Sequence, residues 1–233
     1  MNNECSREPA SLPWRFLLPA LIVPLLGSLI YFVWLPHHPI AKVTYGATKV
    51  FTLCYPLFFI GWRRLLVLPS RSSLASVVSI GLTSGIVISL MGWGLMATPM
   101  GELVREGAGP VKDKAYALGF AQNYLLFAIF VSFFHSALEE FYWRGFVFSK
   151  LRGKLGRWNS HILAALAFAA HHLVVTLQYF PAPLALFLAF CVAIGGFIWT
   201  FLYEKQGNLV GCWLSHLCVD VLLMFIGYQL IFE

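Results

Sequence analysis

Seven long apolar runs constrain the fold of this chain more than any other feature of its sequence. They cover roughly residues 14–35, 41–62, 74–97, 116–147, 159–179, 183–203 and 209–231. A helix that crosses a bilayer needs about 20 predominantly apolar residues. Only 11% of the 233 residues are charged, against about 25% in an ordinary soluble domain. The sequence therefore predicts an all-α fold, a polytopic membrane bundle of about seven transmembrane helices.

No repeat, low-complexity segment or linker divides the chain, so residues 1–233 are expected to form a single integral membrane domain. Its motif-bearing core covers about residues 116–231. The fourth run is too long for one simple crossing, and we expect it to be tilted, broken or partly outside the lipid.

The basic residues lie in short clusters between the runs, so the net charge of +6 does not indicate a nucleic-acid partner. Cytoplasmic loops carry an excess of Lys and Arg, which predicts a cytoplasmic N-terminus and an outer C-terminus. This orientation places ten cations inside: Arg7, Arg15, Arg63, Arg64, Arg71, Lys150, Arg152, Lys154, Arg157 and Lys205.

Ionisable side chains lie within three of the later runs. They are Glu139, Glu140 and Arg144 in the fourth, His171 and His172 in the fifth, and His216 and Asp220 in the seventh. An Asp, Lys or Arg at the centre of a membrane helix costs about 2.5–3.5 kcal/mol, and such groups persist when they pair or do chemistry. Counted from the loops, all three sets lie about 10–20 Å from the cytoplasmic face. We therefore expect the three helices to bring acids and imidazoles to one layer.

Helical spacing separates the roles of the two glutamates. Glu140 and Arg144 are four residues apart, so they share a face and can pair. Glu139 points about 100° away, on the face that carries His135, and burial favours a carboxyl that acts as an acid or base. We expect chemistry from Glu139 and structural support from Glu140 with Arg144. A single structural ion-pair cluster is the alternative.

The histidines fall into four groups. His171 and His172 point in different directions, so only one is expected to enter the site, and spacing does not say which. Asp220 lies one turn from His216 and can accept its ring N–H, which fixes the tautomer. His135 is a further candidate for the site. The remaining histidines, His37, His38 and His161, lie near the ends of runs and are expected at the membrane interface.

The chain resembles the CAAX protease and bacteriocin-processing family of intramembrane endopeptidases. The family motifs are Glu-Glu-x-x-x-Arg, then Phe-x-x-x-His, then His-x-x-x-Asn or a close variant. They correspond here to Glu139-Glu140 with Arg144, to Phe168 with His172, and to His216 with Asp220. Each motif is weak alone, but the three occur together and in order on late membrane helices.

The resemblance implies a helical bundle with a cavity open to the cytosol, and hydrolysis of peptide bonds in a membrane-associated protein or peptide. It selects His172 over His171 as the partner of Glu139 in activating water. The resemblance also implies that His216 and the residue at position 220 stabilise the oxyanion. An ionised Asp220 would repel an oxyanion, so it must orient His216 or be protonated. No cofactor is implied, and we expect a multi-pass protein of a bacterial inner membrane.

Several alternatives remain open at this stage. Glu139, His172, His216 and Asp220 include the ligand types that Zn²⁺ takes, so a zinc-dependent version of the protease is one. The substrate could be a C-terminal sorting signal of secreted proteins. A membrane binding or immunity protein and an ion-coupled transporter are the alternatives without peptidase activity.

Overall fold

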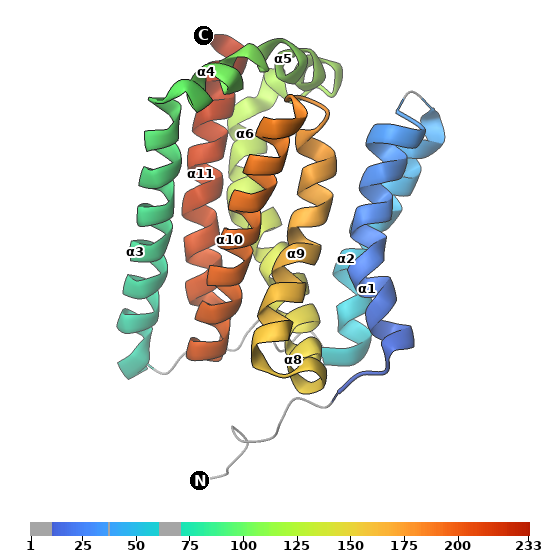
Figure 1. Ribbon diagram of the computed structural model, residues 1–233, viewed down its shortest axis with the longest axis vertical. Coiled ribbons are helices and arrows are strands. Elements are labelled where there is room, and N and C mark those ends of the chain that lie inside the picture. Colours follow the sequence, from blue (N-terminus) through green and yellow to red (C-terminus); the bar gives the residue numbers. More distant parts are fainter. Residues whose placement is uncertain (1–10, 37, 61–70) are drawn as a thin grey trace.

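The computed structural model describes residues 11–36, 38–60 and 71–233, and all regular structure in that part is helical. The elements are α1 (Trp14–Leu29), η1 (Ile30–Trp34), α2 (Pro39–Ile60), α3 (Arg71–Met96), α4 (Pro99–Glu106), α5 (Ala108–Ala117), η3 (Ala121–Asn123), α6 (Tyr124–Ile129), η4 (Phe130–His135), α7 (Ser136–Glu140), η5 (Phe141–Phe148), α8 (Ser149–Leu155), α9 (Arg157–Thr176), α10 (Ala182–Gln206) and α11 (Val210–Phe232). The long helices run side by side, with α4 and α5 across one end and α8 at the other (Figure 1). The predicted all-α bundle is confirmed.

Six helical segments of the described chain are long and apolar enough to cross a membrane. They are Trp14–Trp34, Pro39–Ile60, Ser73–Met96, Ala121–Leu155, Ala182–Gln206 and Val210–Phe232. The predicted run 159–179 falls in α9, which is not among the six. It carries Asn159 and three histidines, and it packs against α1 and α10 among the other long helices (Figure 1).

The fourth apolar run forms one 35-residue helical span, Ala121–Leu155. Two π-helical segments, η4 and η5, lie on either side of the short α7 that carries both glutamates. Such segments are frequent at functional sites because they change which way the helix faces point. Every residue of η5 is buried, and its aromatic side chains pack with Phe168 of α9 and Trp199 of α10 in the main hydrophobic core. The core therefore fixes the helix just beyond the glutamates.

The charged ends of the bundle agree with the loop assignment. Arg152 and Lys154 in α8 lie at the end opposite α4 and α5 (Figure 1), and Lys205 lies in the last turn of α10. Of the other predicted inner cations, Arg7, Arg63 and Arg64 lie outside the described residues, as does the side chain of Arg71. The orientation of the bundle in a membrane stays a prediction.

The place of His161 relative to a membrane stays a prediction, but the structure shows its surroundings. Its side chain is fully buried, with Nδ1 2.7 Å from Oγ1 of Thr200 and Nε2 3.3 Å from Oε2 of Glu204. The Glu204 carboxylate also accepts hydrogen bonds from Arg152 and Arg157, each at 2.8 Å. We call these four residues, Arg152, Arg157, His161 and Glu204, the end cluster. By contrast His38 is exposed, and His37 lies outside the described residues.

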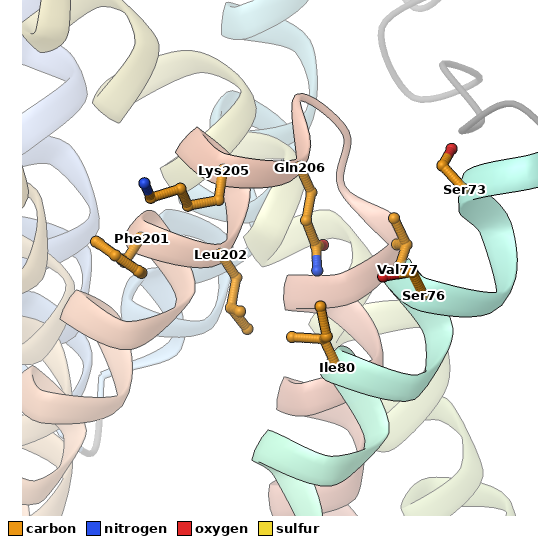
Figure 2. Close-up of a pocket in the computed structure, with 8 residues that line it drawn as sticks. All are labelled: Ser73, Ser76, Val77, Ile80, Phe201, Leu202, Lys205 and Gln206. Carbon is orange, nitrogen blue, oxygen red and sulfur yellow. The ribbon is translucent and has the colours of Figure 1, made fainter.

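A cavity of about 500 Å³ lies between α3 and α10. Figure 2 shows Gln206 at the end of α10 on one side and Ile80 of α3 facing it. None of the motif residues lines this cavity. It is therefore separate from the site described next.

Candidate active site

Three helices bring the motif residues together. Glu139 of α7 has Oε1 3.8 Å from Nε2 of His171 on α9 and Oε2 3.9 Å from Nε2 of His216 on α11. The same nitrogen of His216 lies 3.6 Å from Oδ1 of Asp220. The side chains of Glu139 and Asp220 are each 13% exposed, so the group is largely withdrawn from solvent and lipid.

Glu140 is fully buried and holds two partners. Its Oε1 accepts a hydrogen bond from Nη1 of Arg144 at 2.9 Å and lies 2.7 Å from Nδ1 of His216. The Arg144 guanidinium lies between two aromatic rings, 4.5 Å from the Phe168 centroid and 5.0 Å from that of Trp199. Cation–π contacts of this kind stabilise a desolvated guanidinium. Glu140 is therefore neutralised by Arg144 and also fixes the ring of His216.

The expectation that Asp220 sets the tautomer of His216 is wrong. At 3.6 Å the Asp220 carboxylate is beyond hydrogen-bond distance from Nε2, while Glu140 takes Nδ1. An ionised carboxylate only accepts hydrogen bonds, so Nδ1 carries the proton. Nε2 then faces Glu139 and Asp220. The sequence could not show this contact because Glu140 and His216 are 76 residues apart.

Glu139 is surrounded by imidazoles. Besides His171 and His216, Nε2 of His135 lies 3.6 Å from its Oε1. No guanidinium or ammonium pairs with Glu139 among the residues that the structure describes. His135 is 29% exposed, so it forms the more open edge of the group. The neighbouring glutamates thus have different surroundings, one paired with an arginine and one with histidines alone.

Both histidines of the pair on α9 enter the site, which corrects the expectation that only one would. His171 is the nearer to Glu139, and its ring is parallel to that of Trp143, with 5.8 Å between centroids. His172 has Nδ1 2.9 Å from the carbonyl oxygen of Phe168, so this nitrogen donates a hydrogen bond. In the neutral ring Nε2 is then the acceptor. The two rings are 4.1 Å apart. Two adjacent residues of one helix can both contact a neighbouring helix when their side chains are long enough.

A ligand set for a metal ion is present in these residues. Glu139, His171 and His172 each offer one ligand atom, and these atoms lie within 4.8 Å of one another. Two imidazoles and one carboxylate are a ligand set that catalytic zinc takes. It differs from the set expected from the motifs, since it contains His171 in place of His216 and Asp220.

Trp199 of α10 belongs to the site although no motif includes it. Its ring is stacked on His216, with centroids 4.1 Å apart and planes 16° apart. Its indole Nε1 donates to Oγ of Ser215 at 3.0 Å. Trp199 therefore covers one face of the His216 ring. A tryptophan within an apolar run gives no sequence signal of such a role.

Comparison with known proteins agrees with the motifs. Residues 121–222, from η3 to α11, match the family model described as type II CAAX prenyl endopeptidase Rce1-like. No curated protein and no solved structure matches the chain. The matched segment contains every motif residue, so the family resemblance predicted from the motifs is confirmed. Together with the apolar helices, it supports a membrane protease of the CAAX type.

Proposed function

We propose that this protein is an intramembrane endopeptidase of the glutamic type, in which Glu139 activates a water molecule. The observation that carries the proposal is the contrast between the two glutamates. Glu140 is paired with Arg144 at 2.9 Å, whereas the charged partners of Glu139 among the described residues are histidines. A carboxylate free of a guanidinium can take a proton during a reaction without breaking an ion pair.

The reaction begins when water, held by Glu139 and an imidazole of α9, attacks the peptide carbonyl carbon. The C–O bond forms, one water proton passes to Glu139, and the carbonyl oxygen becomes an oxyanion. The C–N bond then breaks, and the leaving amine takes the proton from Glu139. A positioned general base of this kind contributes about 10²–10⁴-fold to the rate. His172 keeps the role given by its motif, and His171 is a second imidazole beside the same carboxylate.

The oxyanion is stabilised from the side of α11. His216 donates from Nδ1 to Glu140, so it can donate to an oxyanion from Nε2 only as a doubly protonated ring. Glu140 and Asp220, on its two sides, favour that cation. Asp220 then acts through His216 and makes no direct contact with the oxyanion. Fixed donors placed where negative charge develops are usually the largest catalytic contribution.

A zinc-dependent version of the same reaction is the second candidate, and the set Glu139, His171 and His172 favours it. A bound zinc would supply a water of pKa about 7 and a Lewis acid. In the metal-free mechanism, purified active protein contains far less than one equivalent of zinc, and a chelator small enough to enter the site leaves turnover intact. One zinc per chain, lost and restored together with activity, would establish the zinc-dependent mechanism instead.

The substrate that we propose is a membrane-associated protein or peptide, cleaved near its C-terminus. A prenylated chain end, as in the description of the matched family, and a C-terminal sorting signal are the two forms to compare. We place the protein in a bacterial inner membrane as a multi-pass protein. Peptides of both kinds, with and without a prenyl group, can be offered to the protein in lipid nanodiscs.

The test of the proposal is peptide cleavage by the purified protein, followed by mass spectrometry. The wild type is expected to release a C-terminal fragment that the Glu139→Gln variant does not. The matched control is Glu102→Gln, because Glu102 lies exposed on α4 and outside the site. Equal cleavage by all three proteins would reject Glu139 as the base. No cleavage by the wild type of any peptide would favour a binding or transport protein.

A further inference from the structure

The cavity between α3 and α10 has no part in the reaction described above. It lies at the end of the bundle that carries α8, the predicted cytoplasmic end, because α10 finishes there and α3 begins there (Figure 1). Its volume of about 500 Å³ falls within the range of cavities that bind small ligands, roughly 300–1,000 Å³. The cavity is therefore large enough to hold a ligand of its own.

The side chains that line the cavity change from polar to apolar with depth, and they do so on both helices. On α3 the lining begins with Ser73 and ends with Ile80, and this separation of seven residues is about 10 Å along a helix. On α10, which runs in the opposite direction, the lining has Lys205 and Gln206 at the end and Phe201 about one turn deeper. A phospholipid has the same order, with a charged headgroup outside, esters below it and acyl chains deepest.

The carboxamide of Gln206 is a polar group without a partner in this cavity. Its Oε1 and Nε2 are both buried, and neither has a hydrogen-bond partner among the described residues. Figure 2 shows the end of this side chain between α10 and α3, facing Ile80. Gly211 of α11 lies behind it, and a Cβ at that position would overlap Oε1 of Gln206. Buried polar groups are nearly always hydrogen-bonded, so this amide indicates a ligand that carries polar atoms at this depth.

Lys205 supplies a positive charge at the rim of the cavity. It is exposed, and its Nζ lies 5.5 Å from the centroid of the Phe201 ring. The neighbouring carboxylate of Glu204 is held within the end cluster. No carboxylate forms an ion pair with Lys205 in the ranges that the structure describes. Basic pockets between transmembrane helices on the cytoplasmic side bind anionic lipid headgroups, and Lys205 gives this cavity the matching charge.

The deeper part of the cavity is open sideways. Ile80 and Phe201 are 48% and 36% exposed, so the surface between them faces the surrounding lipid. The backbone of α3 is held directly against α11, because a Cβ at Gly81 would lie only 2.6 Å from the carbonyl oxygen of Gly211. This close approach fixes α3 on α11 and leaves the space beside α10 unfilled. An acyl chain from the bilayer has the shape and the chemistry to fill it.

We propose that this cavity binds an anionic phospholipid of the cytoplasmic leaflet. The phosphate of the lipid lies at Lys205, and a carbonyl oxygen of its glycerol esters accepts a hydrogen bond from Nε2 of Gln206. One acyl chain lies between Ile80 and Phe201. The inference does not depend on the proposed peptidase, since it uses no residue of the candidate active site.

Native mass spectrometry of the full chain in detergent measures the binding directly. The protein is titrated with phosphatidylglycerol and with phosphatidylcholine of the same acyl chains. We expect one phosphatidylglycerol to bind about fivefold more tightly, which corresponds to about 1 kcal/mol, the contribution of one cation to the attraction of anionic lipid. Lys205→Gln should bring the two dissociation constants close together. Gln206→Leu should weaken both lipids and keep their ratio, because it removes the hydrogen bond to the esters.

Two matched controls separate this cavity from the rest of the surface. Lys154→Gln removes a cation at the same end of the bundle but outside the cavity, and it should keep the preference. Ile80→Trp fills the cavity and should abolish the binding of both lipids, whereas Ile86→Trp, on an exposed residue of α3 outside the cavity, should bind as the parent does. Equal affinity of the parent for the two lipids, or unchanged binding by Ile80→Trp, would overturn the proposal. The same preference in the Lys205→Gln and Lys154→Gln proteins would also overturn it.

The lipid group of a substrate is the other occupant that a cavity of this form would take. A prenylated peptide is therefore added to the complex of the parent with phosphatidylglycerol. Retention of the phospholipid at a saturating peptide concentration supports the proposal. Displacement of the phospholipid by the peptide, absent with the same peptide lacking its prenyl group, would overturn it and assign the cavity to the substrate.

Discussion

Among the described residues, two groups combine carboxylates, histidines and arginines, and they are organised differently. In the end cluster, Glu204 receives one N–H from each of two arginines, at 2.8 Å both. In the group at the site, one arginine lies near two adjacent glutamates and pairs with Glu140 alone. The end cluster thus has more guanidinium groups than carboxylates, and the site has fewer. This shortage leaves Glu139 available for proton transfer.

The second difference is burial. The arginines of the end cluster are 37% and 38% exposed, whereas Arg144 and Glu140 are 1% and 0% exposed. Exposed ion pairs contribute about 0–1 kcal/mol. Removing one partner of a buried pair costs about 3–5 kcal/mol, because the other charge is left uncompensated. The same residue types therefore give very different sensitivities to mutation.

The largest expected effect on stability is that of Arg144→Ala. The substitution leaves Glu140 as a buried charge without its guanidinium, and about 3–5 kcal/mol of stability should be lost. The measurement is the midpoint of thermal unfolding in detergent. Arg152→Ala in the end cluster is the matched control and should lower stability by at most about 1 kcal/mol. Equal losses in the two variants would remove the distinction between the clusters.

A smaller effect, on rate alone, is expected from the two histidines of α9. Both rings lie at the site, so His171→Ala and His172→Ala should each lower kcat/KM, by about 10²-fold if the ring takes part in proton transfer. His38→Ala, on an exposed histidine, is the control. If the His171 variant keeps full activity, only the histidine of the motif is needed, and the contact of His171 with Glu139 has no catalytic consequence.

The smallest effect is expected from Glu204→Gln. Its carboxylate is partly exposed, at 19%, so the loss of its ion pairs with Arg152 and Arg157 should cost no more than about 1 kcal/mol each. Peptide cleavage should stay at the wild-type rate, because none of the residues of the end cluster is among those around Glu139. A large loss of cleavage in this variant would show that the two clusters are coupled.

The features that the sequence predicted correctly are local in the chain or periodic. The pairing of Glu140 with Arg144 followed from a spacing of four residues, and the helical bundle followed from the length of the apolar runs. Motif order led to the family. Each of these depends on residues within one helix or on their order along the chain.

The features that were missed depend on how separate helices rotate against each other. The burial of His161 could not be predicted from its place near the end of a run, because Thr200 and Glu204 of α10 enclose it. Glu140 reaches His216 across from α7 to α11. The π-helical segments on either side of α7 also change the angle between side chains, and no periodicity in the sequence marks them.

The central claim is that two adjacent glutamates have different tasks, and one paired measurement tests it directly. Peptide cleavage and the midpoint of thermal unfolding are measured on the same preparations of Glu139→Gln and Glu140→Gln. We predict that Glu139→Gln unfolds like the wild type and loses about 10²–10⁴-fold in rate, while Glu140→Gln unfolds at a clearly lower temperature because Arg144 keeps a buried charge. A stable Glu140→Gln protein together with an active Glu139→Gln protein would contradict the account.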